Sequence, residues 1–425
     1  MKKILVTFSV WFVATIMLLA QNDTVNVVNV LNEQTGKEIA IGLPESMSRD
    51  YDDLLKNWHV KNYLMVSDEN CESNGENPIY SDSVYANRLA RIPSIMEMPY
   101  NAEVRKMIDI YSGRMRNKVA YMLGAMNFYM PIFEEALDMY DLPNELKYLP
   151  VIESALNPVA VSRAGAAGLW QFMLKTGRIY NLQSNSLIDE RRDPIKSTYA
   201  AARYLKDLYG IYNDWSLVIA AYNCGPGNIN KAIQRSGGKA DYWTIYNYLP
   251  RETRGYVPAF IAANYIMTYY CEHNICPLRA ELPAGTDTVQ IHSDLHFQQI
   301  IDVCKVELDE IRALNPQYKR DIIPGNSMTC TLRLPREAVT LFINSGDSIY
   351  AHRAKEFFKK RKYVDLKSTA VAKSSNGKLI YHKIRRGETL SKIARKYGVT
   401  VKKIRKWNGL RGNSITAGKR LKIYR

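Results

Sequence analysis

The sequence is poor in cysteine and histidine, and neither residue type forms a cluster with the spacing of metal ligands. There are six Cys and six His among 425 residues. Zinc sites draw their ligands mainly from these two residue types, and structural sites place them in close pairs along the chain. We therefore expect no metal site.

Long hydrophobic runs are lacking after the first residues of the chain. Lys2 and Lys3 precede an apolar run over residues 4–20, and polar residues follow. This layout is typical of a secretory signal peptide over residues 1–20 and predicts a protein exported to the periplasm or cell envelope. A retained membrane anchor is the alternative, because the run is just long enough to span a bilayer. No Cys follows the run, so the sequence offers no site for N-terminal lipidation.

Export determines how the cysteines are interpreted, because disulfides persist outside the cytoplasm. Connectivity cannot be deduced from spacing alone, and buried free thiols are the alternative. The first pairings to test join neighbours in the sequence. They are Cys271 with Cys276 and Cys304 with Cys330, which leaves Cys71 and Cys224 over.

Acidic residues are scarce near the C-terminus. The net charge is +16, and within residues 380–425 Glu388 is the one acidic side chain. A basic patch often indicates nucleic-acid binding. An exported protein rarely meets nucleic acid, so we expect no nucleic-acid partner and favour an anionic cell-wall or membrane surface. Simple solvation of a small module is the alternative.

Hydrophobic periodicity divides the chain into regions. Residues 21–100 are rich in Asn and Ser in places, and we interpret them as a poorly structured leader with a helix or two. Residues 101–275 alternate long apolar-periodic segments with Pro and Gly, which predicts a mainly α domain without a convincing strand.

An internal repeat follows Pro283. At one constant offset, Ile291 aligns with Ile384, Asn315 with Asn408 and Gly325 with Gly418, and no gap is needed. Each copy, residues 286–336 and 379–425, reads strand, helix, helix, strand. Thr389 is expected to cap the first helix of the second copy and Gly398 to end it. Residues 337–378 are expected to form a basic linker.

The second copy is similar to a LysM domain. Its GETL start, YGV turn and WN at the end of the second helix lie where that family has them. The resemblance implies binding to chains that contain N-acetylglucosamine. The copy at residues 286–336 lacks GETL and resembles a degenerate LysM, for which sugar binding and a pure packing role both stay open.

A carboxylate in the helical region lies on an apolar face. Leu146, Leu149 and Glu153 share one side of a helix that Asn157 and Pro158 should end. Burial disfavours the charged form of a carboxyl group, so its pKa rises and it can serve as a general acid near neutral pH. Taken alone, an ordinary surface Glu is the alternative.

Three further motifs follow in order: GLWQ at residues 168–171, AYNCGPG at 221–227 and RGYVP at 254–258. Small residues in SRAGAAG at 162–168, which leads into GLWQ, would let backbone approach a ligand, and Gln171 can both donate and accept hydrogen bonds to a sugar. The alternative is a glycine turn ahead of a helix.

Together with Glu153-Ser154, these motifs resemble the soluble lytic transglycosylase family over roughly residues 105–270. Trp170 departs from that family, which usually has Met there. The implied architecture is α+β and multidomain: a mainly α, lysozyme-like catalytic domain followed by small βααβ LysM modules. The resemblance assigns substrate-binding roles to Ser154, Ser162, Gln171, Tyr222, Asn223 and Tyr256.

The resemblance also implies a reaction without a cofactor. Glu153 would protonate the β-1,4 bond between N-acetylmuramic acid and N-acetylglucosamine in peptidoglycan strands. It would then act as base on the C6 hydroxyl, which closes a 1,6-anhydro ring, while the 2-acetamido group replaces the second carboxylate of other glycosidases.

Two other functions stay open. A non-catalytic wall-binding protein is one. A lysozyme-like hydrolase is the other, and it needs a second carboxylate. The nearby candidates are Asp189, Glu190 and Asp193, which we interpret as a solvated turn in which Asp193 starts the next helix.

Overall fold

The computed structural model describes residues 27–32, 36–56, 64–65, 71, 76–280, 285–358, 379–385, 387–410 and 412–424. The expected signal peptide, residues 1–20, lies outside this part. The chain divides into two compact units, residues 1–354 and 355–425. No helix in the described ranges is long and apolar enough to cross a membrane.

The segment expected to be a poorly structured leader instead belongs to the core of the first unit. Its strands β1 (Val27–Asn32) and β2 (Lys37–Gly42) form an antiparallel hairpin, and helices η1 (Glu45–Ser48), α2 (Tyr51–Leu55) and α4 (Asp82–Arg91) follow. The helices allowed for by the expectation are present, but the expectation of little structure was wrong, because apolar residues of this segment pack against helices far away in the sequence. Those fully or nearly fully buried include Ile41, Leu43, Met47, Leu54 and Tyr85.

Helices make up the region from residue 101 to 275. They are α5 (Ala102–Ser112), α6 (Arg116–Met139), η2 (Asn144–Tyr148), α7 (Leu149–Ser154), α8 (Leu174–Ile179), η3 (Glu190–Arg192), α9 (Pro194–Tyr212), α10 (Trp215–Cys224), α11 (Pro226–Arg235), α12 (Tyr242–Ile245), η4 (Tyr246–Tyr248), α13 (Arg251–Thr268) and η5 (Cys271–His273). This region, described throughout, contains isolated β-bridges but no strand, which confirms the mainly α prediction.

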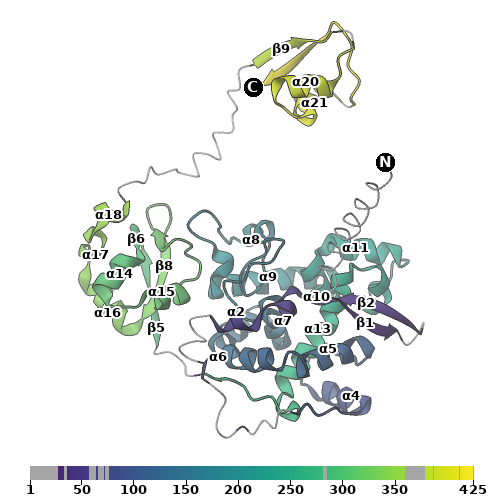
Figure 1. Ribbon diagram of the computed structural model, residues 1–425, viewed down its shortest axis with the longest axis vertical. Coiled ribbons are helices and arrows are strands. Elements are labelled where there is room, and N and C mark those ends of the chain that lie inside the picture. The colour runs from purple at the N-terminus through teal and green to yellow at the C-terminus, as the bar shows by residue number, and fades with distance from the viewer. Residues whose placement is uncertain are drawn as a thin grey trace, which may run out of the picture. The chain divides into compact units, whose positions relative to one another are not determined.

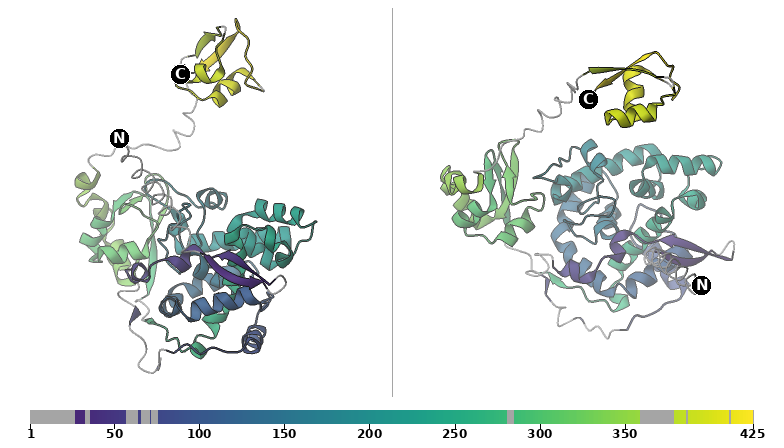
Figure 2. Two further views of the ribbon diagram at one scale, coloured as in Figure 1. Left: turned by 45° about the vertical axis from the view of Figure 1, so that its right-hand side comes forward. Right: turned by 45° about the horizontal axis from the view of Figure 1, so that its top comes forward.

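Helix α13 is the central element of the helical region. It packs against α5, α10, α7 and strand β2, and β1 packs against α5. Figures 1 and 2 show the β1–β2 hairpin beside α5 and α13. The approach is close because Gly42 and Gly255 meet: a Cβ on Gly255 would lie 1.9 Å from the Gly42 carbonyl oxygen. Only glycine allows backbones to come this near.

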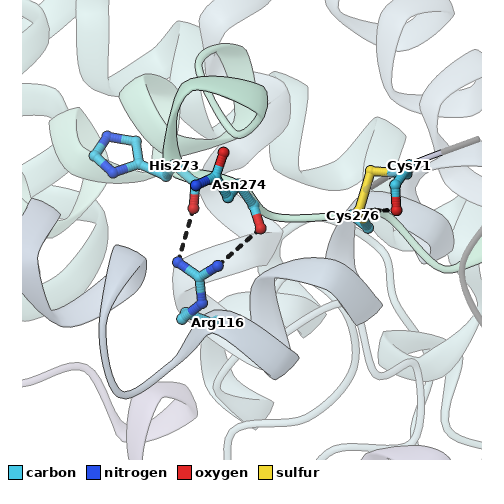
Figure 3. Close-up of a disulfide and its surroundings, with 5 residues drawn as sticks. All are labelled: Cys71, Arg116, His273, Asn274 and Cys276. Atoms are coloured by element: carbon cyan, nitrogen blue, oxygen red, sulfur yellow. Dashed lines mark hydrogen bonds between the residues drawn. A yellow bond between two sulfur atoms is a disulfide. The ribbon is translucent and has the colours of Figure 1, made fainter. Parts of the chain in front are cut away.

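A disulfide links the segment that precedes the helical region to the end of that region. It joins Cys71 to Cys276, so both pairings expected from sequence neighbourhood were wrong. Cys271 instead is exposed. Arg116 holds the adjoining turn, because its guanidinium donates to the carbonyl oxygens of His273 (2.7 Å) and Asn274 (2.8 Å), as Figure 3 shows. Strands β3 (Leu64–Met65) and β4 (Arg279–Ala280) pair beside this disulfide.

A small module with its own hydrophobic cluster follows. Strand β5 (Thr286–Ile291) pairs with β8 (Cys330–Pro335), and β6 (Asp294–His296) pairs with β7 (Ile322–Pro324). Helices α14 (Phe297–Cys304) and α15 (Leu308–Leu314) complete the expected unit, and α16 (Arg336–Ser345) and α17 (Ser348–Ala351) continue it; α18 (Ala354–Phe358) follows at the boundary between the two compact units. Ala338, Val339 and Phe342 of α16 are buried in the module's cluster. The linker therefore does not begin at residue 337, since an amphipathic helix occupies that stretch.

The C-terminal unit repeats the architecture of the module. Strands β9 (Leu379–Lys383) and β10 (Arg420–Tyr424) pair, and α20 (Leu390–Tyr397) and α21 (Val401–Asn408) lie between them in the chain (Figure 2). Thr389 caps α20 and Gly398, at φ +65°, ends it, as predicted.

One hydrogen-bond pattern confirms the internal repeat. The Asn315 amide donates to the carbonyls of Ile311 and Arg333 and accepts from the Arg333 N–H. Asn408 makes the same three bonds, with Ile404 and Lys422 as partners. The aligned asparagines therefore tie the second helix to the last strand in both copies.

Candidate active site

Glu153 lies near the end of α7, on the face that the sequence predicted to be buried. Leu146 and Leu149 are completely buried, and Glu153 itself is partly exposed. The helix ends one residue later than Glu153, because Ala155 and Leu156 adopt left-handed φ values of +51° and +59°. This stop precedes the expected one at Asn157. A non-glycine residue in this region carries strain, which is common at functional sites.

The Glu153 carboxyl is held by a tyrosine from α13. The hydroxyl of Tyr256, whose side chain is nearly fully buried, donates a short hydrogen bond to Glu153 Oε1. The pKa of Glu153 is raised to about 8: burial is the largest cause, the charges of nearby Glu252 and Glu45 act in the same direction, and the Tyr256 hydrogen bond opposes them. A carboxyl group in this state is protonated at neutral pH, as a general acid requires.

Tyr222, at the tip of α10, belongs to the same cluster. Its hydroxyl donates to the carbonyl oxygen of Trp170 at 2.7 Å. Burial and the charge of Glu153 raise the pKa of Tyr222 well above its usual value. Next to it, Asn223 Oδ1 accepts from the Thr253 hydroxyl at 2.9 Å, which joins α10 to α13. Three helices thus bring Glu153, Tyr222 and Tyr256 together.

Ser162 and Gln171 organise the loop over residues 162–172. Ser162 Oγ accepts from the Ala166 N–H at 3.0 Å, and the Gln171 amide donates to the Gly168 carbonyl at 2.7 Å. Gln171 has φ +46° and Gly168 has φ +87°. Both predicted residues therefore shape the loop, and Trp170, between Gly168 and Gln171, is the residue that Tyr222 contacts.

Ser154 differs from the prediction. Its side chain is fully buried, and its hydroxyl lies within hydrogen-bond distance of two carbonyl oxygens, those of Leu169 (2.9 Å) and Pro150 (3.1 Å), either of which can accept its proton. A buried hydroxyl with both contacts inside the protein cannot touch a sugar. Ser154 instead ties α7 to the 162–172 loop, so its assignment as a substrate-binding residue was wrong. The motif identified the right junction but not the direction of this side chain.

Two carboxylates near Glu153 were missed by the sequence reasoning. Glu45 is on η1 and accepts from the Arg163 backbone N–H at 3.2 Å, and Glu252 is in the first turn of α13. Burial and the charge of Glu45 raise the pKa of Glu252. Glu252 precedes the RGYVP motif and could have been nominated for that reason. Glu45 carries no local signal, because only tertiary packing of the leader brings it here.

The three carboxylates expected as a second acid or base, Asp189, Glu190 and Asp193, make other contacts within the protein. Asp189 and Glu190 are buried, so the expected solvated turn was wrong. Asp189 pairs with Arg191 at 2.8 Å, and Glu190 pairs with Lys196 at 2.6 Å. Asp193 caps α9 by accepting from two backbone N–H groups, which confirms its predicted place at the helix start.

Groups of three or more His, Cys, Asp or Glu that could hold a metal ion are absent from the described ranges. The site combines the Glu153 carboxyl, the hydroxyls of Tyr222 and Tyr256, and the loop over residues 162–172. These groups support proton transfer to and from an oxygen atom.

Three family models match the chain. Residues 130–245 match the transglycosylase SLT domain, residues 285–351 the LysM-like domain of lytic transglycosylase MltD, and residues 382–423 the LysM domain. The chain therefore contains a transglycosylase SLT domain, followed by a LysM-like domain and a LysM domain.

One relative that the chain resembles over most of its length is membrane-bound lytic murein transglycosylase D of Escherichia coli. The two are 29% identical over 335 residues, which cover 77% of this chain and 70% of that protein. Soluble lytic murein transglycosylase of Escherichia coli is 32% identical over 124 residues, or 28% of this chain and 19% of the relative. The crystal structure of the 70 kDa soluble lytic transglycosylase from Escherichia coli aligns with a TM-score of 0.30 at 26% identity, covering 36% of this chain and 27% of the other.

Proposed function

We propose that this peptidoglycan lytic transglycosylase cleaves the β-1,4 bond between N-acetylmuramic acid and N-acetylglucosamine and leaves 1,6-anhydro-N-acetylmuramic acid. The observation that carries the proposal is the Glu153 carboxyl, held against the Tyr256 hydroxyl with its pKa raised to about 8. Such a group is an acid before bond cleavage and, once it has lost its proton, a base after it.

The first step is proton transfer from Glu153 to the glycosidic oxygen as the C1–O bond breaks. The neighbouring acetamido oxygen stabilises the positive charge at C1, which removes the need for a protein nucleophile. In the second step, Glu153 takes the proton of the C6 hydroxyl while that oxygen bonds to C1, so the carboxyl returns to its starting state. The second attack is intramolecular and avoids the entropic cost of positioning a water.

The remaining site residues have supporting roles in this proposal. Tyr256 orients the Glu153 carboxyl, and Tyr222 and Gln171 hold the loop that faces it. Asn223 presents its amide at the tip of α10, where it is partly exposed. Ser162 lies in the loop turn, and we propose that this turn contacts the sugar next to the scissile bond.

A hydrolase is the second candidate, because the structure brings Glu45 and Glu252 near Glu153. Either carboxylate could activate a water, which is the role that Asp189, Glu190 and Asp193 cannot fill. Product analysis distinguishes the two reactions. Purified peptidoglycan is digested and the glycan ends are analysed by mass spectrometry before and after borohydride reduction. Ends that resist reduction and are lighter by one water support the transglycosylase, whereas reducible ends support hydrolysis and direct attention to Glu45 and Glu252.

Relatives with envelope functions support a site of action at the bacterial cell envelope. We propose that residues 1–20 direct export to the periplasm, and that the C-terminal LysM domain holds the enzyme on strands containing N-acetylglucosamine. Membrane association through a retained N-terminal segment is the competing proposal. Fractionation of cells, with the N-terminal residue of the mature protein determined, tests both.

A further inference from the structure

The LysM-like module and the catalytic region share a short stretch of antiparallel backbone. Ile188 forms a β-bridge with Tyr318, the Asp189 N–H donates to the Gln317 carbonyl at 2.8 Å, and the Lys319 N–H donates to the Leu187 carbonyl at 2.8 Å. Backbone pairing of this kind fixes the spacing and direction of both segments.

The contact is apolar as well as polar. Ile188 belongs to the catalytic region in sequence, but its side chain is 2% exposed and lies in the hydrophobic cluster of the module. The Lys319 ammonium donates to the Asn185 carbonyl at 2.9 Å and lies 3.6 Å from Asp189 Oδ2. The module therefore contacts residues 185–189 through backbone hydrogen bonds, through the buried Ile188 side chain and through Lys319.

Asp189, the last residue of the segment that the module contacts, forms a buried ion pair with Arg191. Asp189 accepts two hydrogen bonds from Arg191, at 2.9 Å from Nε and 2.8 Å from Nη2. Both side chains are at least nine-tenths buried. Arginine and carboxylate in this forked geometry fix each other's orientation. Loss of either partner would leave an uncompensated buried charge.

Arg191 contacts the active-site loop, residues 162–172, directly. Its Nη1 donates to the carbonyls of Gly165 (2.8 Å) and Phe172 (3.0 Å), which lie on either side of Gln171 and Gly168. Its own backbone carbonyl lies against Gly168, where a Cβ would come within 1.7 Å of that oxygen. One residue thus fixes the loop at three points.

We propose that the LysM-like module of residues 285–351 braces the active-site loop, with Asp189 and Arg191 as positioning residues for the reaction. The proposal rests on the function proposed above, because the braced loop is the one that Tyr222 contacts across from Glu153. It also gives the module a role that needs no sugar-binding surface. The C-terminal LysM domain and this module therefore have different tasks despite their common architecture.

The loop needs an external brace for a physical reason. The left-handed φ of +46° at Gln171 is costly for a residue that has a Cβ, and surrounding contacts are needed to keep such a conformation populated. Misplacement of a catalytic loop by about 1 Å can lower turnover roughly 100-fold. A brace therefore acts on kcat, whereas a carbohydrate-binding module acts on KM and on retention by insoluble substrate.

The test uses the full chain with Ile188→Asp, which removes the module's hold without changing any group at the active site. Hydrogen exchange followed by mass spectrometry measures the amides of residues 162–172, and kcat and KM are measured on short soluble glycans. We expect faster exchange in this loop with unchanged exchange in α13, and a fall in kcat of about 10- to 100-fold with KM nearly constant.

Arg312→Met is the matched control. Arg312 pairs with Asp321 at 2.7 Å and with Asp309 at 3.5 Å, both inside the same module. It should leave both measurements unchanged. Lys319→Met, a milder change on the gripping surface, keeps the proposal testable where Ile188→Asp fails to fold, and should shift exchange in the same direction.

The exchange measurement does not depend on the reaction, so it separates this proposal from the proposed function. Glu153→Gln should be inactive with wild-type exchange in the loop. Wild-type exchange and kcat in both Ile188→Asp and Lys319→Met would overturn the brace, and a change confined to KM would show that the module is a binding unit.

Discussion

Glu153 has a neutral carboxyl because several influences act in the same direction. Burial is the largest, and the charges of Glu252 and Glu45 add to it, while the Tyr256 hydroxyl favours the ionised form. The hydrogen bond does not cancel the raised pKa, so the group is protonated at pH 7 and ready to donate. This balance predicts how both activity and stability depend on pH.

The first residue-scale prediction concerns the pH profile of turnover. The first step needs protonated Glu153, whose pKa is raised to about 8, so kcat should be maintained at neutral pH and fall as the pH rises through about 8. Initial rates of glycan cleavage between pH 5 and 10 measure the profile. Tyr256→Phe removes a hydrogen bond that lowers this pKa and should move the alkaline limb upward. A limb below pH 6 would contradict the assignment of Glu153.

The second residue-scale prediction is that Glu153→Gln abolishes cleavage while leaving the fold intact. The amide keeps the size of the side chain but has no proton to give. Folding raises the pKa of Glu153 from 4.5 to about 8, so the wild type loses stability as the pH rises between these values. The variant lacks this loss. Its thermal midpoint should therefore exceed that of the wild type, and the gap should widen from pH 5 to pH 8. Turnover in a folded variant would contradict the proposed mechanism.

At the scale of elements, the 162–172 loop depends on one glycine. Gly168 has φ +87°, and the Arg191 carbonyl occupies the space that a side chain would need. Gly168→Ala therefore adds backbone strain to a steric clash, and the loop must move. We expect a loss of roughly 1–3 kcal/mol in the free energy of unfolding together with a large loss of kcat.

Gly227→Ala is a suitable control for that substitution. Gly227 lies in the AYNCGPG motif at the start of α11, and nothing lies within 4 Å of an added Cβ. Denaturant unfolding and initial rates of both variants test the prediction. Equal stability and turnover of the two would mean that the loop tolerates displacement.

Element types were predictable where local patterns determine them. The apolar face that carries Glu153, the capping of α9 by Asp193 and the two-copy repeat all follow from periodicity and short motifs. The β1–β2 hairpin, the burial of Ser154 and the Cys71–Cys276 disulfide do not, because each depends on a partner distant in the chain. Glu45 escaped prediction for the same reason. The catalytic roles of the site residues stay predictions until the variants are measured.

At the scale of the whole molecule, the hydrophobic clusters correspond to parts of the chain with different proposed roles. Within the described ranges, the helical region, the LysM-like module and the C-terminal domain each have a hydrophobic cluster, and the cluster of the module includes Ile188 from the helical region. In the C-terminal domain, Glu388 is the one acidic side chain among many basic ones. Its carboxylate accepts hydrogen bonds from the His382 ring and from the Arg385 N–H, both in the same domain.

Deletion of residues 379–425 should therefore weaken binding to insoluble peptidoglycan but spare turnover of short soluble glycans. None of the proposed catalytic groups lies in this domain, and the cluster members that the described ranges supply, from Ile384 to Ile423, all belong to it. Co-sedimentation with sacculi at moderate salt compares the truncated and full-length chains. Full-length Glu153→Gln is the control and should pellet like the wild type. Equal pelleting of the truncated chain would show that the tether lies elsewhere.

The contact between strand β2 and helix α13 determines how the catalytic part can be isolated. A recombinant fragment trimmed to the SLT match, residues 130–245, would contain Glu153 and Tyr222 but would omit Tyr256 and Glu45. It would also expose the apolar surface of α10 that α13 covers. A useful expression boundary lies before β1 at one end and beyond Cys276 at the other. Because the module grips residues 185–189, the fragment that preserves the loop extends to residue 351.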